Sequence, residues 1–215
     1  MKNNNSIVNK YYELFENNMK FKKVYTEQRI KLYKQIVDIL LMLNVNSVLD
    51  VGCAFGLLVE LANQFGIDAY GLDLPIDELK MFHQSLLLSS GKFIYGSIIE
   101  DNSIINQIAE KRFQAIVMLD TLRYITSIDC ITKLKPEFII VKEVNSNFVM
   151  RYIRKNQFDV RLYSVLDLHK LFPSYIIHLL YSSKNIFAFK NPSLFFLLTI
   201  GRLLPTYTAI FKRKV

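Results

Sequence analysis

Residues 47–65 limit the fold of this chain more than any other segment. They join a short β-favouring run to a helical run through a turn that contains Gly52 and Gly56. Small residues in such a turn let the backbone approach a ligand closely, and the helix that follows presents free amide donors and the positive end of its dipole. The segment therefore predicts a strand, a turn and a helix, with the turn shaped to hold a nucleotide-like ligand.

The rest of the chain repeats short apolar runs that are separated by segments of helical length. These runs cover residues 69–72, 93–95, 115–119 and 138–141. Strands that alternate with helices in this way form a mostly parallel sheet with helices on both faces. Near the end, residues 174–180 and 186–190 flank a polar turn and predict an antiparallel hairpin. We therefore expect an α/β fold: a doubly wound, mostly parallel seven-stranded sheet with a C-terminal antiparallel hairpin.

The length and composition favour one globular domain. Of the 215 residues, 51% are hydrophobic and 21% are charged, which excludes a disordered or collagen-like chain. Cys53 and Cys130 are too few for a disulfide framework and lack metal-ligand spacing. The first ten residues contain no apolar run of the kind that a signal peptide needs. We expect a cytoplasmic protein without a metal site.

Two groups of basic residues raise the question of an anionic partner. The formal net charge is +8 at pH 7, and clustered Lys and Arg side chains can bind phosphates or acidic lipids. The groups comprise Arg151, Arg154, Lys155 and Arg161, and then Lys212, Arg213 and Lys214. We favour a solvated surface over a binding patch for both, because charge runs most often form solvent-exposed faces.

The C-terminal stretch 192–205 is apolar almost throughout. Arg202 and Pro205 keep its apolar run below the roughly 20 residues that a membrane-spanning helix needs. We expect this stretch to be buried within the fold or in an oligomer. Peripheral contact with an anionic membrane surface, together with the basic tail, is the second interpretation.

A carboxylate follows the glycine turn at the spacing that nucleoside binding requires. Residues 69–73 form the second apolar run and end in Asp73, about 20 residues past the turn. In sheets of this kind a carboxylate at that position holds ribose hydroxyls, and a carboxylate accepts two hydrogen bonds well. The turn and Asp73 therefore support the same ligand.

These features resemble the class I S-adenosylmethionine-dependent methyltransferases over roughly residues 25–190. The first motif of that family is a hydrophobic pair, an acidic residue and a Gly-x-Gly-x-Gly turn, and the matching residues are Asp50, Gly52, Ala54 and Gly56. Ala54 replaces the middle glycine, and Asp73 matches the acidic residue of the second strand. A dinucleotide-binding turn needs glycine at its sixth place, where this chain has Leu57, so NAD binding is the weaker interpretation.

The resemblance implies S-adenosylmethionine as the cofactor and S-adenosylhomocysteine as its product. Ser97 departs from the acidic residue that the family usually has near the adenine, although a backbone donor at Ile98 can still read the ring edge. The implied cofactor-binding residues are Asp50, Gly52, Cys53, Ala54, Gly56, Asp73, Leu74, Ser97, Ile98 and Leu119. The resemblance also makes residues 1–24 a lid, residues 25–190 the cofactor-binding domain, and residues 191–215 an extension of that domain.

The expected reaction is an in-line methyl transfer, for which orientation and proximity provide most of the catalysis. A base is needed only for a poorly acidic hydroxyl or amine, and the candidates are Asp120, Tyr124 and His169. Helix capping explains Asp120 equally well. Lys142 and Glu143 end the fifth strand, where they either flank the substrate or form a surface ion pair.

We expect the methyl acceptor to be a small molecule, a glycan or a lipid precursor. The Asn/Asp-Pro-Pro-Tyr type of motif found in amino-methylating nucleic-acid enzymes is absent, and Cys130 lacks the Pro-Cys or Thr-Cys setting of a cytosine-carbon enzyme. One alternative is a nucleic-acid methyltransferase. The other is a non-catalytic Rossmann-like module that binds RNA or a protein through its basic groups.

Overall fold

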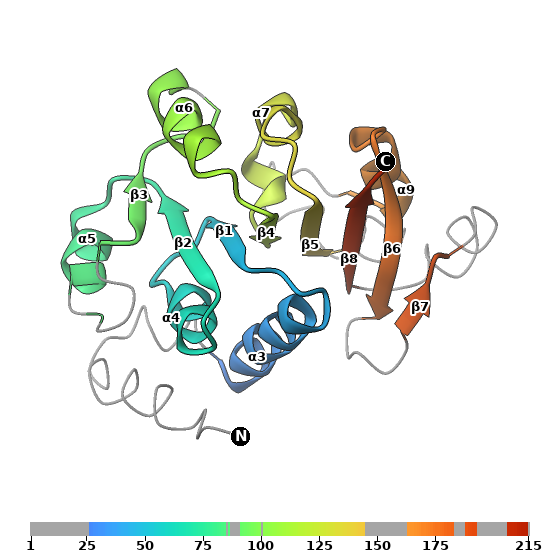
Figure 1. Cartoon of the computed structure of the whole chain (residues 1–215), viewed down its shortest axis with the longest axis horizontal. Coiled ribbons are helices and arrows are strands. Elements are labelled where there is room, and N and C mark those ends of the chain that lie inside the picture. Colours follow the sequence, from blue (N-terminus) through green and yellow to red (C-terminus); the bar gives the residue numbers. More distant parts are fainter. Residues whose placement is uncertain are drawn as a thin grey trace, which may run out of the picture. The chain divides into compact units, whose positions relative to one another are not determined.

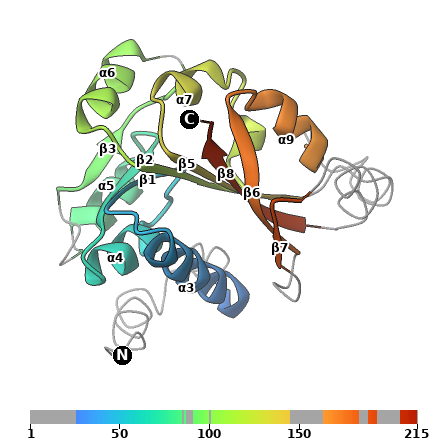
Figure 2. The same ribbon diagram turned by 45° about the vertical axis from the view of Figure 1, so that its right-hand side comes forward.

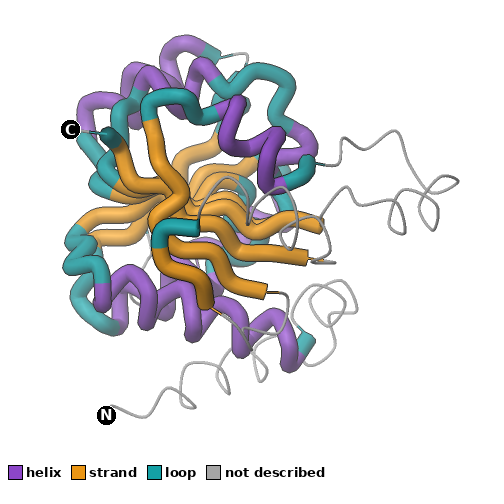
Figure 3. The backbone as a smooth tube through the Cα atoms, turned by 90° about the vertical axis from the view of Figure 1, so that its right-hand side faces the viewer, coloured by secondary structure: helices purple, strands orange, loops and turns teal. Residues whose placement is uncertain are grey.

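Figure 1 shows a computed structural model of the chain. The structure describes residues 26–84, 86, 91–99, 101–144, 163–182, 188–192 and 206–214. The chain divides into two compact units, Met1–Gly96 and Ser97–Val215, and each is described by itself. Helices and strands alternate along most of the described chain. Figure 3 distinguishes the helices from the strands by colour. The expected α/β class is confirmed.

The first unit contains three parallel strands in the order β3-β2-β1. Its elements in chain order are α3 (Glu27–Met42), β1 (Ser47–Val51), α4 (Leu57–Gln64), β2 (Asp68–Asp73), α5 (Asp77–Gln84) and β3 (Phe93–Tyr95). All of β1 beyond Ser47 is buried, as expected for a strand of a sheet that is covered on both faces. Helix α4 packs against β2 and α3 (Figure 1).

Helix α3 shows how the local sequence sets these elements. Thr26 caps its N-terminus by accepting a hydrogen bond from the backbone N–H of Arg29, which satisfies one of the free amide groups of the first turn. Ile36 and Leu40 are one helical turn apart and are fully buried, so they fix the face that packs on the unit. The helix is therefore both capped and anchored.

The second unit continues with parallel strands and then changes to antiparallel pairing. Its elements are α6 (Asn102–Lys111), β4 (Ala115–Leu119), the 3-10 helix η1 (Leu122–Tyr124), α7 (Asp129–Lys133), β5 (Phe138–Val144), α9 (Val165–Leu171), β6 (Tyr175–Ser182), β7 (Ala188–Lys190) and β8 (Thr206–Arg213). The strand order is β4-β5-β8-β6-β7. Among the strands described in this unit, β4 and β5 are the one parallel pair.

The C-terminal hairpin is confirmed, and one strand was not anticipated. β6 and β7 pair antiparallel, with Leu180 opposite Phe189. β8 lies between β5 and β6 and pairs antiparallel with both (Figure 2). The described residues therefore form eight strands, and Lys212 and Arg213 of the basic tail belong to β8. This strand was not expected because its C-terminal end is charged. Its central residues Ala209 and Ile210 are apolar and fully buried.

Candidate functional site

The glycine turn follows β1 and is tied to the end of β2. Gly52, Ala54 and Gly56 all have positive φ, at 76°, 49° and 75°. The backbone N–H groups of Gly52 and Cys53 both donate to the carbonyl oxygen of Leu72, at 2.8 and 3.2 Å. Glycine adopts such φ values readily, whereas Ala54 does so at a steric cost. The turn therefore has a fixed left-handed path that its two glycines make accessible.

Gly56 is also required by the space around it. A methyl group at this position would lie 2.6 Å from two carbons of the Phe93 ring. The same ring also packs against Gly71 of β2. An added methyl group at Gly71 would lie 2.7 Å from Phe93 Cδ1 and 2.6 Å from Cys53 Sγ. Cys53 thus contributes its backbone to the turn, while its thiol is packed against β2, and burial raises the pKa of that thiol well above its usual value.

Asp73 lies beside the turn, as the sequence predicted. Its Oδ2 accepts a hydrogen bond from the backbone N–H of Ala54 at 2.7 Å, and its Oδ1 accepts one from the N–H of Leu74 at 2.8 Å. The side chain of Asp73 remains partly exposed, and that of Leu74 is exposed. The turn at the end of β1 and the carboxylate at the end of β2 therefore form one structure.

His83 of α5 holds the other side of Ala54. Its Nε2 lies 2.7 Å from the Ala54 carbonyl oxygen, and its Nδ1 lies 3.0 Å from the Tyr95 hydroxyl. Because a carbonyl only accepts, Nε2 carries the proton, and in the neutral ring Nδ1 accepts from Tyr95. The ring stacks on Phe93 at a centroid distance of 3.6 Å, and burial lowers the pKa of His83. Ala54 is thus held at its N–H by Asp73 and at its carbonyl by His83.

His83 was not predicted from the sequence to take part in the site. Its position depends on α5, β3 and the turn meeting in three dimensions, which local spacing does not reveal. The available signal was on β3, where Phe93 and Tyr95 are two residues apart and so share one face of the strand. Both contact His83.

Asp50 of β1 is a buried carboxyl group, with 4% of its surface exposed. Burial and the nearby charge of Asp73 raise the pKa of Asp50 to about 7, and Arg29 of α3 lowers it. Arg29 also donates from Nε to the Tyr33 hydroxyl at 3.2 Å. Asp50 therefore titrates near neutral pH, so a cation placed beside it would draw it into the charged form.

In the second unit, Ser97 and Ile98 begin the segment after β3. The Ser97 hydroxyl accepts from the N–H of Ile99 at 3.3 Å, and its carbonyl accepts from the N–H of Asp101 at 3.1 Å. The side chain of Ile98 is buried, as is that of Leu119 at the end of β4. Ser97 thus shapes its own turn.

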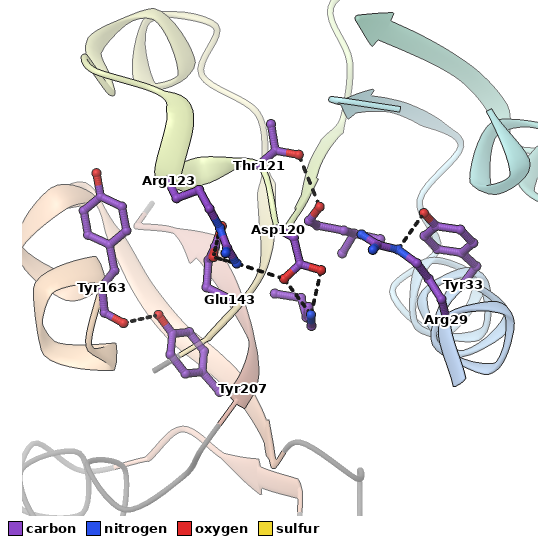
Figure 4. A network of polar contacts seen from close by, with 10 residues as sticks. Arg29, Tyr33, Asp120, Thr121, Arg123, Glu143, Tyr163 and Tyr207 are labelled. Atoms are coloured by element: carbon purple, nitrogen blue, oxygen red, sulfur yellow. Dashed lines mark hydrogen bonds and ion pairs between the residues drawn. The ribbon is translucent and has the colours of Figure 1, made fainter. Parts of the chain in front are cut away.

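A cluster of four charged side chains lies at the carboxyl ends of β4 and β5 (Figure 4). Lys142 Nζ contacts both carboxylate oxygens of Asp120, at 2.6 and 2.7 Å. Arg123 donates from Nη2 to Asp120 Oδ1 at 3.1 Å and to Glu143 Oε2 at 2.7 Å. Asp120 has a positive φ of 59°, and its N–H donates to the Lys142 carbonyl. The interpretation of Lys142 and Glu143 as a surface ion pair is wrong, because Lys142 pairs with Asp120 and Glu143 is buried with 1% of its surface exposed.

The three candidate bases differ in their surroundings. Asp120 is held by two cations, which occupy its carboxylate oxygens. Tyr124 lies in η1 with 66% of its surface exposed. His169 lies in α9, but its side chain is outside the part of the chain that the structure describes. Of the three, Asp120 is the one that the second unit brings into a charged cluster.

The fold of the chain is similar to the folds of solved methyltransferase structures. No protein-family model and no curated protein matches it. Magnesium protoporphyrin IX methyltransferase from Synechocystis PCC 6803, solved with bound S-adenosylhomocysteine, matches at 14% identity and a TM-score of 0.60, over 98% of this chain and 100% of that one. A methyltransferase from Clostridium acetobutylicum matches at 14% and 0.59, over 97% and 100%. The small RNA methyltransferase HEN1 matches at 16% and 0.52, over 85% of this chain and 25% of that one.

The chain has the class I methyltransferase fold. The sequence resemblance to this family rested on the turn after β1 and the carboxylate at the end of β2. In the structure these two features are in contact. In the second unit, the charged cluster lies where β4 and β5 end.

Several predictions fall on residues that the structure does not describe. They concern the lid at residues 1–24, the basic group Arg151, Arg154, Lys155 and Arg161, and most of the apolar stretch 192–205. These stay predictions. Among the helices that are described, none combines the length and the apolar character needed to cross a membrane.

Proposed function

We propose that the chain is an S-adenosylmethionine-dependent methyltransferase that binds its cofactor in the first unit, at the turn after β1 and at Asp73. The observation that carries this proposal is the 2.7 Å contact between Asp73 Oδ2 and the N–H of Ala54. It joins the two parts of the chain that a nucleoside needs, a close-approach turn and a ribose acceptor. The methyltransferase fold of the solved structures agrees with this reading.

The residues present fit an adenosyl ligand. Each carboxylate oxygen has two lone-pair directions, and the N–H groups of Ala54 and Leu74 use one on each oxygen of Asp73. The described residues leave one direction per oxygen, which matches the two hydroxyl groups of a ribose. Gly52 and Gly56 carry no side chain at the two ends of the turn, and no side chain in the described unit caps the N-terminus of α4.

The chain's own part in the reaction is binding and orientation. Bound S-adenosylmethionine supplies a methyl group that its sulfonium already activates. Asp73 would hold the ribose, and the backbone of the turn would hold the neighbouring part of the ligand. The amino group of the ligand would favour the charged form of Asp50. His83 keeps the Ala54 carbonyl fixed while Asp73 is engaged. Such fixed positioning converts an encounter into a reaction between held groups.

The acceptor that we propose is a small molecule, a glycan or a lipid precursor. The printed names of the similar structures include enzymes of magnesium protoporphyrin IX and of small RNA, so the fold alone does not select an acceptor. The missing Asn/Asp-Pro-Pro-Tyr type of motif supports a target other than a nucleic-acid amino group. Mass spectrometry of the purified protein, with and without denaturation, would identify an acceptor that is retained.

Binding of S-adenosylhomocysteine to the Asp73→Ala variant tests the cofactor site. Hydrogen bonds to a charged group are worth about 1.5–3 kcal/mol each, so we expect a loss of affinity of at least tenfold by calorimetry. Asp77→Asn is the matched control, because Asp77 is an exposed carboxylate of α5 that pairs with Lys80 on the same helix. It should bind like the wild type. Failure of the unaltered chain to bind S-adenosylhomocysteine would contradict the proposal and favour a non-catalytic module.

A further inference from the structure

The carboxylate of Glu143 has one oxygen to which none of the described residues donates a hydrogen bond. Glu143 lies near the carboxyl end of β5 and is almost fully buried. Arg123 donates to its Oε2 twice, from Nη2 at 2.7 Å and from Nε at 3.2 Å. Its Oε1 is buried and has no hydrogen-bond partner among the described residues. A buried acceptor without a donor is costly, so such atoms call for an explanation.

The donors around Glu143 are engaged elsewhere. Arg123 contacts Oε2 and Asp120, and Lys142 contacts both oxygens of Asp120. Tyr207 of β8 stands directly opposite Glu143 in the strand pairing, but its hydroxyl donates to the Tyr163 carbonyl at 3.0 Å (Figure 4). Burial keeps that hydroxyl protonated by raising the pKa of Tyr207 well above its usual range. Within the described part of the second unit, these contacts leave Glu143 Oε1 without a donor.

The place of Glu143 in the sheet is one where ligands bind. In open α/β sheets, ligands occupy the region outside the carboxyl ends of the parallel strands. β4 and β5 are parallel, and Asp120 and Glu143 come at these ends. Asp120 and Lys142 each keep about a fifth of their side-chain surface exposed (23% and 21%), so solvent reaches the cluster that surrounds Glu143. The unused oxygen thus belongs to a cluster that opens to the outside.

The charges of the cluster restrict what the oxygen can receive. Among the described side chains of the cluster, two cations, Arg123 and Lys142, face two carboxyl groups, Asp120 and Glu143, so these four side chains offer no net positive charge to a carboxylate or a phosphate. Such a group at Oε1 would also meet the lone pairs of Glu143. A hydroxyl or an amine, in contrast, brings the missing N–H or O–H donor.

We propose that Glu143 Oε1 is a recognition point for a hydroxyl or amine group of the methyl acceptor, with Arg123 holding the carboxylate in place through Oε2. This proposal rests on the proposed function for the identity of the ligand as an acceptor. Glu143 is then a specificity-determining residue, and Arg123 is its positioning residue. Burial raises the pKa of Glu143, and the nearby charge of Arg123 opposes this rise.

The test follows the carboxyl carbon of Glu143 by NMR in wild-type protein labelled with ¹³C at glutamate Cδ. The Glu143 resonance is assigned by its absence in Glu143→Gln, or in Glu143→Asp if the first variant does not fold. Phenol and benzylamine serve as donor probes. Anisole, the methyl ether of phenol, is the matched probe without a donor.

We expect phenol and benzylamine to shift the Glu143 resonance in a saturable manner, and anisole to bind at least fivefold more weakly at that resonance. Glu137 is the internal control, because its carboxylate lies beyond the other end of β5 and accepts from Gln114 at 3.1 Å. Its resonance should stay unchanged. Equal effects of phenol and anisole, or no effect of either donor probe up to its solubility, would overturn the proposal and indicate that water fills the place beside Oε1.

Binding of S-adenosylhomocysteine to the same wild-type sample separates the two proposals. If that ligand binds and the donor probes do not shift Glu143, the acceptor site is wrong and the cofactor site stands. If the donor probes shift Glu143 and S-adenosylhomocysteine does not bind, the recognition point stands as a ligand site, but its assignment to a methyl acceptor is overturned.

Discussion

Ala54 adopts a left-handed backbone conformation that side chains rarely take. Its N–H is held by Asp73 and its carbonyl by His83, so the conformation is imposed from both sides. The turn therefore tolerates Ala54 at its middle place, because Asp73 and His83 hold the backbone of Ala54 in this conformation. The steric cost of a non-glycine residue in this region is about 1 kcal/mol.

Replacing Ala54 by Gly should relieve that cost. We expect Ala54→Gly to raise the free energy of unfolding by roughly 0.5–1 kcal/mol, which corresponds to a Tm increase of a few degrees. Thermal unfolding followed by circular dichroism measures the change. Ala69→Gly is the control, since Ala69 lies buried inside β2, where glycine weakens a strand, and it should lower Tm. A fall in Tm for Ala54→Gly would show that the methyl group packs favourably.

Asp50 makes the stability of the fold depend on pH. Its pKa of about 7 in the folded state lies above the ordinary carboxyl value of 3.8. Between these two pH values the folded chain therefore keeps a proton that the unfolded chain releases. The contribution of Asp50 to the free energy of unfolding is fully present at low pH and is lost as the pH rises from about 4 to about 7. Asn at position 50 does not ionise. Between pH 5 and pH 8, the wild type should lose unfolding free energy relative to Asp50→Asn.

Urea unfolding of both proteins at the two pH values measures this difference. Asp77→Asn serves as the control, because the side chain of Asp77 is 91% exposed, and its curve should run parallel to that of the wild type. A difference between wild type and Asp50→Asn that stays constant with pH would show that Asp50 is ionised throughout.

At the scale of elements, α4 begins at a glycine that is confined by both its backbone and its neighbours. Gly56→Ala should destabilise the fold by about 2–4 kcal/mol, because the left-handed φ and the contact with Phe93 both oppose a methyl group. Gly66→Ala is a matched control, since Gly66 has a similar φ of +81° but open space around it, and should cost only about 1 kcal/mol. Chemical denaturation compares the two. Equal losses would mean that the Phe93 ring moves aside.

Strand β8 should be essential to the second unit. Phe211 is fully buried, lies opposite Ile139 of β5, and has its ring 5.1 Å from that of Phe172. Phe211→Ala should therefore cost about 3–5 kcal/mol of unfolding free energy. The control Ile176→Ala removes a large apolar side chain from the exposed face of β6 and should cost below 1 kcal/mol. Similar losses for both would contradict a core role for β8.

At the scale of the whole molecule, the sequence predicted the elements whose signals are local. The buried runs of β4 and β5, the turn after β1 and the β6–β7 hairpin each have their pattern within a few residues. β8 was missed because the pairing that places it between β5 and β6 is not written in its own sequence, and its charged end resembles a surface tail.

The candidate site divides in the same way. Asp73 and the turn were predicted to meet, and they do. His83 was not predicted as a site residue, and flanking the substrate was only one of two interpretations of Glu143. Each position depends on partners from separate elements: His83 on β3 and the turn, and Glu143 on Arg123. Side-chain burial of this kind is decided by tertiary packing.

The late position of β8 in the chain has a consequence for biosynthesis. A ribosome completes β5 and β6 before it has made the strand that joins them. Until residues 206–213 emerge, both strands carry open edges that can pair with other nascent chains. Cells would therefore be expected to shield this half of the polypeptide with chaperones during translation, while the first unit, whose three strands follow one another closely, can close early.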